Sequence, residues 1–336
     1  MSAPPPPDAA LLAFARRALN LADAPPPDLV PITRGGSDRV YRRLTAGGST
    51  WIVMQYGKGR RENASFAPIA RFLAAHDVRV PRILAEDAAR GLLVLEDLGD
   101  RDLWSYRDAD PASRLALYRR TLRLVRRLHG LAAGDAAVRA LPLMDPFDAA
   151  LYRWERDYFR ENFVRGVCAL ALDPSEAAAL EAELAALAAR LEGAAPCLVH
   201  RDLQSQNVMI HAGEPVLIDF QGMRLGSCLY DLGALLYDPY VRLTPDVRLG
   251  LLGDYYDLGP QALPWDAFRE SFQEASVQRL LQALGAYGYL GLKAGHPDFL
   301  AHIPRGLDHL EAAVNLAPRL DRLRRLVSRC RRAINR

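Results

Sequence analysis

A polar loop that runs into a short apolar hairpin constrains this chain of 336 residues more than any other feature. Residues 199–207 read Val-His-Arg-Asp-Leu-Gln-Ser-Gln-Asn, and two apolar runs, 208–210 and 216–218, follow on either side of a turn. Short apolar runs separated by a few residues that include glycine predict a β-hairpin. The second run leads directly into Asp219-Phe220-Gln221, so the hairpin joins the polar loop to a second acidic position.

Three side chains in this stretch meet the needs of phosphoryl transfer from ATP. The reaction requires a carboxylate that orients and deprotonates the acceptor hydroxyl, and oxygen ligands for the Mg²⁺ that neutralises the phosphates. We expect Asp202 to be the catalytic base, and Asn207 and Asp219 to be Mg²⁺ ligands. Asp and Asn also cap turns in many loops, but their order and spacing here are far more specific than either residue alone. His200 and Arg201 are expected to brace the loop.

The rest of the chain divides into a strand-rich part and a helical part, and its length favours two lobes. Residues 1–30, which hold two proline runs, are expected to form an appendage with a short helix over 8–21. Residues 31–97 are expected to form a small nucleotide-binding lobe, an antiparallel sheet with one helix. Residues 98–336 are expected to form a larger helical lobe with the catalytic loop and the acceptor site. The predicted strands are 40–45, 50–56, 78–84 and 92–95, and the predicted helices are 65–76, 111–131, 146–165, 174–191, 228–241, 264–290 and 304–334.

From about residue 34 to 315 the chain resembles the aminoglycoside phosphotransferase-like kinases, through the loop, the Asp-Phe-Gln run and the order of the lobes. The resemblance implies an α+β fold of the two-lobed protein-kinase type, with ATP and Mg²⁺ as cofactors. Within that family the chain is most similar to bacterial anomeric kinases of N-acetylmuramate and N-acetylglucosamine, which phosphorylate the C1 hydroxyl in cell-wall recycling. The positions that carry this closer likeness are Ser37, Arg39, Tyr41, Arg43, Arg90, Gly91, Gln204, Gln221 and the runs 95–99, 230–232, 278–285 and 299–304.

The nucleotide side departs from the usual kinase pattern. Kinases place a lysine in the third strand, where it binds phosphates and pairs with a helix Glu, but this chain has Met54 there. Lys58 is expected to be a solvent-exposed residue, and Arg39, Arg42 or Arg43 could supply the positive charge. Glu62 stays open as the helix partner. The residues expected around the nucleotide are Gly35, Gly36, Ser37, Arg39 and Met54 at the phosphates, and the backbone of Glu96 to Leu98 at the adenine.

Two glutamines accompany the motif residues. Gln204 and Gln221 can each donate and accept hydrogen bonds, which suits a polyhydroxylated acceptor, although bracing of the loop is an equal alternative. Asp231 opens an apolar helix and is expected to anchor the catalytic loop through backbone hydrogen bonds.

Other functions remain as rivals at this stage. One is a kinase of another small alcohol, such as an aminoglycoside, choline or a different hexose. An aminoglycoside or choline site needs acids, and Asp238, Asp254 and Asp257 are candidates. Another is a pseudokinase-like module that binds nucleotide without transferring phosphate, which the missing strand lysine suggests.

Composition limits the partners. The formal net charge is +3, and the last 18 residues hold eight Arg and one Asp, which favours a solvated, docked helix over a nucleic-acid site. The four cysteines form no metal-binding pattern, and no signal peptide or membrane span is recognised. We therefore expect a cytoplasmic enzyme with a small-molecule sugar acceptor and no membrane partner, while the sequence does not indicate an oligomeric state.

Overall fold

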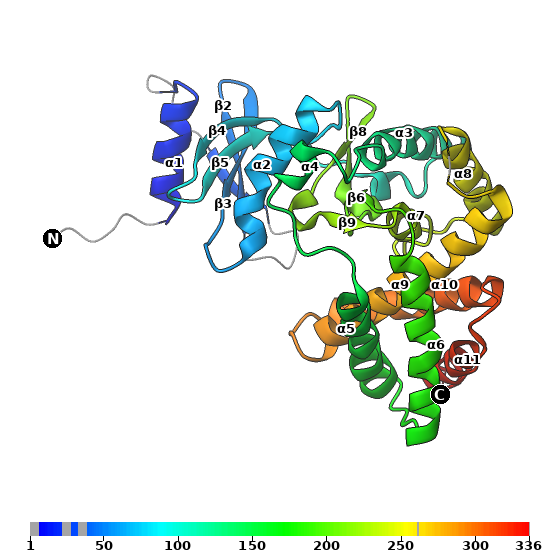
Figure 1. The fold of residues 1–336 in the computed structure, drawn as a ribbon. Coiled ribbons are helices and arrows are strands. Elements are labelled where there is room, and N and C mark those ends of the chain that lie inside the picture. The colour runs from blue at the N-terminus through cyan, green and yellow to red at the C-terminus, as the bar shows by residue number, and fades with distance from the viewer. Residues whose placement is uncertain (1–6, 22–27, 33–38, 261, 336) are drawn as a thin grey trace.

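The computed structural model describes residues 7–21, 28–32, 39–260 and 262–335 of the chain. Gly35, Gly36 and Ser37, predicted near the nucleotide phosphates, lie outside the described residues. Figure 1 shows a small sheet-containing lobe joined to a larger helical lobe, which is the α+β architecture that we expected. The small lobe contains α1 (Pro7–Ala18), β1 (Asp28–Ile32), β2 (Val40–Ala46), β3 (Ser49–Gln55), α2 (Arg61–Ala75), β4 (Ile83–Asp87) and β5 (Leu92–Glu96).

The sheet of the small lobe has five antiparallel strands in the order β1-β2-β3-β5-β4. Three of the four predicted strands are confirmed within one residue at each end. The prediction of a strand over 78–84 was wrong, because β4 begins only at Ile83. Pro81 has no backbone N–H for a strand ladder, so Val78 and Val80 are buried in irregular backbone instead.

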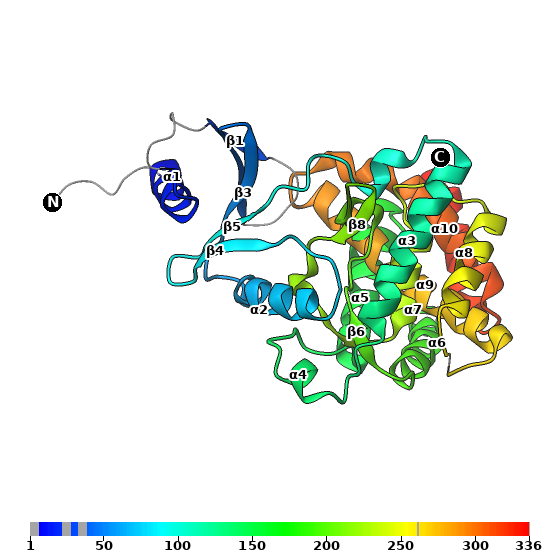
Figure 2. The ribbon, with the colours of Figure 1, turned by 90° about the horizontal axis from the view of Figure 1, so that it is seen from above.

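Helices cover both faces of this sheet. Along β3 and β5 the side chains alternate, so that Val53 and Val94 pack against α1 while Met54 and Leu93 belong to the core that includes α2. Figure 2 shows α1 and α2 on opposite sides of the sheet, with α1 away from the large lobe. The expectation of an appendage over 1–30 is therefore corrected for the described residues, because α1 and β1 complete the small lobe.

The large lobe is helical, with short strands around the catalytic loop. The prediction of one helix over 304–334 was wrong, because Pro318 lies between two helices. The structure also has a helix over 245–257 that the sequence did not predict. The hairpin is confirmed as β7 and β8. The lobe contains η1 (Leu103–Tyr106), α3 (Pro111–His129), α4 (Ala136–Arg139), α5 (Ala149–Phe159), the π-helix η2 (Arg160–Val167), α6 (Pro174–Glu192), β6 (Cys197–Val199), η3 (Ser205–Asn207), β7 (Val208–His211), β8 (Glu214–Leu217), η4 (Phe220–Gly222), β9 (Arg224–Gly226), α7 (Cys228–Leu236), α8 (Pro245–Asp257), α9 (Trp265–Leu292), η5 (Pro297–His302), α10 (Ile303–Leu316) and α11 (Asp321–Ile334).

The Arg-rich C-terminal segment forms α11, which docks on the large lobe. Its apolar face, with Leu323, Leu326 and Val327, is buried. Ion pairs join Arg329 to Glu176 and Arg331 to Asp308 and Glu311. These contacts confirm the expectation of a docked terminal helix.

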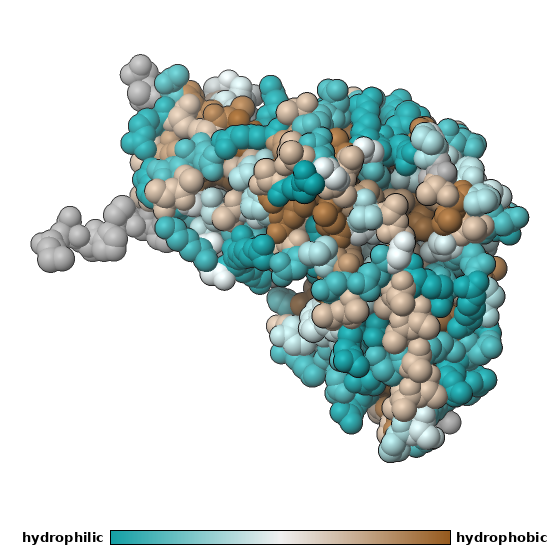
Figure 3. Space-filling model, viewed as in Figure 1, coloured by the Kyte–Doolittle hydropathy of each residue, from teal (hydrophilic) through white to brown (hydrophobic). Residues whose placement is uncertain are grey.

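The surface seen in Figure 3 is mostly hydrophilic, with a paler band along α6. This helix buries its leucines and exposes alanines such as Ala178, Ala182 and Ala186, which favour the helical conformation. No helix within the described ranges is long and apolar enough to cross a membrane.

Candidate functional site

The catalytic loop between β6 and β7 is held from below by α7. Asp231 accepts hydrogen bonds from the backbone N–H groups of His200, at 2.6 Å, and Arg201, at 2.8 Å, and lies 3.1 Å from Nε2 of His129. Arg201 has a φ of 78°, a left-handed conformation that costs a non-glycine residue about 1–3 kcal/mol. The two backbone hydrogen bonds to Asp231 offset this strain and fix the direction of the next residue, Asp202.

His200 links the loop to the hairpin. Its Nε2 lies 2.9 Å from the carbonyl oxygen of Ile218, the residue before Asp219. A carbonyl oxygen can only accept, so the proton of the His200 ring must be on Nε2. His200, which is buried, therefore connects the loop of Asp202 with the backbone that carries Asp219.

Two arginines face the carboxylate of Asp202. Arg201 Nη1 lies 3.2 Å from Oδ2, and Arg279 Nη2, from α9, lies 3.4 Å from Oδ1. Burial opposes ionisation of Asp202, but the charges of Arg201 and Arg279 outweigh it and hold the pKa of Asp202 below its ordinary value. Asp202 is thus an anion at neutral pH, and about a third of its side chain is accessible.

Asn207 precedes and Asp219 follows the hairpin, so both lie at its open end, opposite the turn. Nδ2 of Asn207 donates to the carbonyl oxygen of Asp202 at 2.8 Å, and the backbone N–H of Ile218 donates to the Asn207 carbonyl at 3.0 Å. Because its amide nitrogen faces the loop, the acceptor end of the Asn207 side chain points elsewhere. Asp219 has a φ of 61°, and its side chain is 43% exposed. The donor set of one carboxylate and one amide oxygen fits Mg²⁺, which takes its remaining ligands from phosphates and water.

Among the described residues, side chains alone do not build a metal site. No group of three or more His, Cys, Asp or Glu side chains that could hold a metal occurs in the described part of the chain. Two protein ligands are the number expected where Mg²⁺ is bound together with a nucleotide.

Arg39 lies beside Asp219 and the helix Glu, the groups near which a kinase would place its strand lysine. Its Nη2 lies 3.3 Å from Oδ1 of Asp219 and 3.8 Å from Oε1 of Glu62, on α2, and its side chain is 4% exposed. Lys58 is exposed, as expected. Met54 is fully buried in the core, and its contact with the nucleotide stays a prediction. Glu62 also pairs with Arg60, at 3.7 Å, so the contact with Asp219 is what distinguishes Arg39 from Arg60.

The other arginines that the sequence left open have different partners. Arg43 makes a two-pronged contact with Asp97 in the connector, at 2.7 and 3.1 Å, and also binds Asp100. Arg42 pairs with Asp8 of α1. Neither contact is directed at Asp219, so Arg39 is the arginine that the structure brings to the candidate phosphate side.

The connector between the lobes has its own contacts. Glu96 pairs with Arg82 at 3.3 Å, and the Leu98 carbonyl oxygen lies 3.3 Å from Nδ1 of His211 on the hairpin. These contacts tie the connector to both lobes. The adenine site at the backbone of Glu96 and Leu98 stays a prediction.

The two glutamines differ in their surroundings. Gln221 is 3% exposed, and its Nε2 donates to Oδ1 of Asp219 at 2.6 Å. Gln204 is half-buried, and its backbone N–H donates to the Asp202 carbonyl at 2.8 Å. This geometry favours bracing of Asp219 by Gln221, while a sugar contact of Gln204 stays a prediction.

A cluster of polar residues of the large lobe, near the two arginines that face Asp202, was not predicted from the sequence. Glu155 on α5 is buried and accepts hydrogen bonds from the Tyr230 hydroxyl, at 2.7 Å, and from Gln278, at 2.8 Å. Arg279 follows Gln278 on α9. A run of polar residues inside a mostly buried helix was the signal that could have found them, since buried charges need partners.

Comparison with known proteins now adds to this geometry. The model of the phosphotransferase enzyme family matches residues 28–289, which is most of the chain. The chain belongs to the phosphotransferase enzyme family. The protein is therefore an enzyme, and the match includes the catalytic loop, the hairpin and most of both lobes.

Among curated relatives, this phosphotransferase is 29% identical to the N-acetylmuramate/N-acetylglucosamine kinase of Pseudomonas putida over 319 residues, 91% of this chain and 89% of the relative. The enzyme of the same name from Pseudomonas aeruginosa is also 29% identical, over 314 residues, with the same coverage. These relatives are aligned along nearly their whole length.

Solved structures support the fold of the phosphotransferase. A choline/ethanolamine kinase family protein from Mesorhizobium loti has a TM-score of 0.60 at 19% identity, covering 97% of this chain and 99% of that one. An ADP-bound aminoglycoside phosphotransferase has a TM-score of 0.59 at 14% identity, covering 92% and 99%. The two-lobed kinase-like fold is thereby confirmed.

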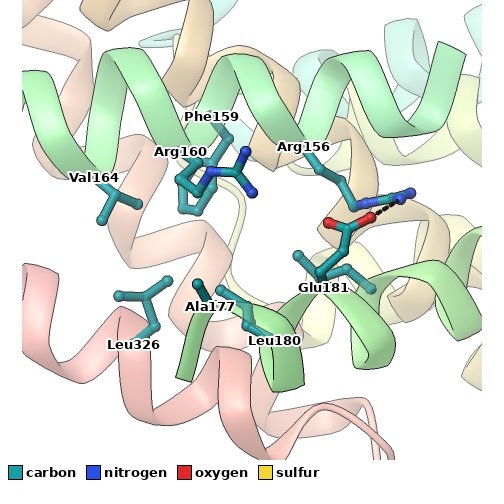
Figure 4. A pocket seen from close by; sticks show the side chains of 9 residues that line it. Arg156, Phe159, Arg160, Val164, Ala177, Leu180, Glu181 and Leu326 are labelled. Atoms are coloured by element: carbon teal, nitrogen blue, oxygen red, sulfur yellow. Dashed lines mark hydrogen bonds and ion pairs between the residues drawn. The ribbon is translucent and has the colours of Figure 1, made fainter. Parts of the chain in front are cut away.

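The pocket in Figure 4 is not the site of this phosphotransferase. It lies between α5, η2, α6 and α11, and its charged residues include Arg156 and Glu181, which already pair at 2.7 Å. Its lining contains neither Asp202 nor Asp219. The pocket is a packing gap between helices and shares no lining residue with the candidate site at the catalytic loop.

Proposed function

We propose that this phosphotransferase is an ATP- and Mg²⁺-dependent sugar kinase. Its acceptor is the anomeric C1 hydroxyl of an N-acetylated amino sugar, N-acetylmuramate or N-acetylglucosamine. Two curated relatives with 91% coverage of this chain carry these sugars in their name. A neighbour of the same fold is bound to ADP, which supports an adenine nucleotide as the donor.

The positive charge around Asp202 is the observation that favours a sugar over a cationic acceptor. Arg201 and Arg279 both contact the carboxylate. A cationic acceptor such as choline or an aminoglycoside would bring another positive charge to this place, which costs electrostatic energy. A neutral or acidic sugar meets no such repulsion.

Of the acids considered for a cationic acceptor, two already have partners and one is exposed. Asp238 accepts hydrogen bonds from the backbone N–H groups of Ser205, at 2.8 Å, and Tyr240, at 2.9 Å. Asp254 pairs with Arg119, and Asp257 is an exposed residue at the end of α8. None of these contacts builds an acidic lining at the catalytic loop, which favours the sugar over choline.

In the proposed mechanism the acceptor hydroxyl donates a hydrogen bond to Asp202. The hydroxyl oxygen attacks the γ-phosphorus in line, the new O–P bond forms as the bond to ADP breaks, and the proton passes to Asp202. Mg²⁺, when bound, neutralises the phosphate charge. Asn207 and Asp219 would hold this ion, and Arg39 orients Asp219 and adds positive charge on the phosphate side.

A pseudokinase is the rival that the missing lysine suggested. The pairing of Arg39 with Glu62 restores a cation on the helix Glu, and Asp202, Asn207 and Asp219 are all present around the loop. A module that only binds nucleotide has no need of this set.

The four cysteines, all free thiols, agree with action in the reducing cytoplasm.

A coupled ADP-release assay tests the proposal with N-acetylmuramate, N-acetylglucosamine, glucose, choline and an aminoglycoside as acceptors. Turnover is expected with the two N-acetylated sugars, and NMR of the product should show phosphorus coupled to the C1 proton. Preferential turnover of choline or the aminoglycoside would refute the acceptor class. Nucleotide binding without ADP release for any acceptor would favour the pseudokinase.

A further inference from the structure

Strand β9 places an arginine beside the catalytic loop. Arg224 lies opposite Val199 in the β6–β9 pair, and Val199 directly precedes His200. Two residues before Arg224, a Cβ built on Gly222 would lie 3.6 Å from Nη1 of Arg201. Arg224 therefore leaves the sheet at the base of the loop that carries Asp202.

Arg224 is buried without a protein counter-ion. It is 7% exposed, and its guanidinium carbon lies 5.3 Å from the ring centre of Phe147. Its Nε has no hydrogen-bond partner, and the described residues place no carboxylate oxygen within 4.0 Å of the guanidinium. The contact that remains is with an aromatic face.

Other buried arginines of the molecule have polar partners. Arg279 pairs with Asp202, and Arg156 pairs with Glu181. Arg248 resembles Arg224 most closely, since it is 6% exposed and lies 3.8 Å from the Tyr237 ring centre. However, Arg248 donates hydrogen bonds to two backbone carbonyl oxygens, at 3.0 and 3.2 Å.

The carboxyl groups near Arg224 are engaged with other residues. Asp202 pairs with Arg201 and Arg279, and Glu155 accepts hydrogen bonds from Tyr230 and Gln278. Asp231 and Asp238 accept hydrogen bonds from the backbone of the loop. Burial raises the pKa of Glu155, which weakens its negative charge, and burial together with Arg201 lowers the pKa of Arg224. A buried charge without a partner is strongly unfavourable, so this arrangement calls for an anion from outside the chain.

We propose that Arg224, together with Arg201 and Arg279, binds a carboxylate of the acceptor sugar and thereby sets a preference for acidic over neutral acceptors. This inference rests on the proposed function. N-acetylmuramate carries such a carboxylate and N-acetylglucosamine lacks it, so the two sugars differ at the group that Arg224 would recognise.

The transferred phosphoryl group is the other anion that could reach this region. Of the groups that we assign to the phosphates, Arg39 lies before β2 in the small lobe and pairs with Asp219 and with Glu62 of α2, so this side of the site faces the small lobe. Arg224 instead packs on Phe147, whose ring lies 4.5 Å from that of Tyr230 on α7, within the large lobe. The surroundings of Arg224 therefore favour the acceptor.

The test compares kcat/KM for N-acetylmuramate, its neutral methyl ester and N-acetylglucosamine. The wild-type enzyme should prefer the acid to its ester by about tenfold or more, because charge-assisted hydrogen bonds to the carboxylate are lost in the ester. Arg224→Gln should lower kcat/KM for N-acetylmuramate by about 10- to 100-fold and change that for N-acetylglucosamine by less than about threefold. Arg224→Lys should restore part of the preference, since the charge is kept.

Arg248→Gln is the matched control, because it removes a buried, ring-stacked arginine that has carbonyl partners. It should lower thermal stability and leave the ratio between the two sugars unchanged. An equal loss for both sugars in Arg224→Gln would assign the anion to the phosphoryl group and overturn the inference. If that variant does not fold, equal rates of the wild type on the acid and its ester overturn it in the same way. A wild type that phosphorylates neither sugar would refute the proposed function itself.

Discussion

Replacing Arg39 by Gln tests whether the phosphate-side cation of this enzyme has moved from the third strand to the residue before β2. Arg39 Nη2 lies 3.3 Å from Asp219 and 3.8 Å from Glu62, within a side chain that is 4% exposed. The variant keeps a polar side chain of similar length but removes the charge. The variant should therefore lower kcat/KM for ATP without leaving a cavity in the core.

The size of the effect follows from these distances. At 3.3 Å, two unit charges attract by about 5 kcal/mol at an effective dielectric constant of about 20. Desolvation offsets most of this, and hydrogen bonds to charged groups contribute about 1.5–3 kcal/mol net. Since 1.36 kcal/mol is a factor of about ten, Arg39→Gln should lower kcat/KM for ATP by about 10- to 150-fold.

Steady-state kinetics with ATP varied at saturating acceptor measure this loss, and thermal unfolding shows whether the variant folds. Lys58→Ala is the matched control, because Lys58 is exposed on the same lobe and should change kcat/KM by less than about threefold, about 0.6 kcal/mol. A hundredfold loss in Lys58→Ala, with Arg39→Gln near wild type, would refute the reasoning and make Lys58 a displaced strand lysine.

Met54→Lys examines the same idea from the other side. Met54 is fully buried in the core that includes Phe66 of α2, so a lysine there loses its hydration without a prepared partner. The variant should not exceed wild-type kcat/KM for ATP in the same assay. A gain in activity would mean that the enzyme lacks a cation which Arg39 does not supply.

The catalytic loop, the helical core and α11 each allow a further test. Asp202→Asn should lower kcat by about 100- to 10,000-fold while nucleotide affinity, measured by calorimetry, survives; wild-type turnover would exclude Asp202 as the base. Burial lowers the pKa of His309 to about 4 from an ordinary 6.5, so the unfolded chain binds the proton first and stability falls as pH drops from 6.5 towards 4. The loss should approach about 3 kcal/mol in denaturant titrations, and His309→Asn should flatten it. Leu326→Ala, on the buried face of α11, should cost about 2–5 kcal/mol of unfolding free energy, whereas the exposed Arg325→Gln should cost less than about 0.5 kcal/mol.

Local patterns predicted most elements of this fold because one face of each is buried. The helix over 174–191 is confirmed within one residue at its C-terminal end, since its leucines recur at helical spacing. The helix at Pro245–Asp257 was missed because its apolar residues form no clear stripe, although Thr244 caps it and Pro245 opens it. The capping residues were therefore the stronger signal for this helix than the spacing of its apolar residues.

Some residues of the candidate site could also be predicted from the sequence, and others could not. Asp202, Asn207 and Asp219 were recognised because they lie within 18 residues of one another in the chain. Arg279 is 77 residues from Asp202, and only the packing of α9 brings it to 3.4 Å. Arg39 was one of three arginines that the sequence could not separate, because the choice depends on which of them faces α2.

The lowered pKa of Asp202 bears on how such a loop can act. A carboxylate held between Arg201 and Arg279 is a weak base at neutral pH, so it cannot remove the acceptor proton before the new bond begins to form. It can still orient the hydroxyl, and the proton can follow once the attacking oxygen has lost electron density to phosphorus. In the proposed mechanism, the arginines that lower the basicity of Asp202 also provide positive charge for an acidic acceptor. The weak base and the preference for an acidic acceptor would then have the same structural origin.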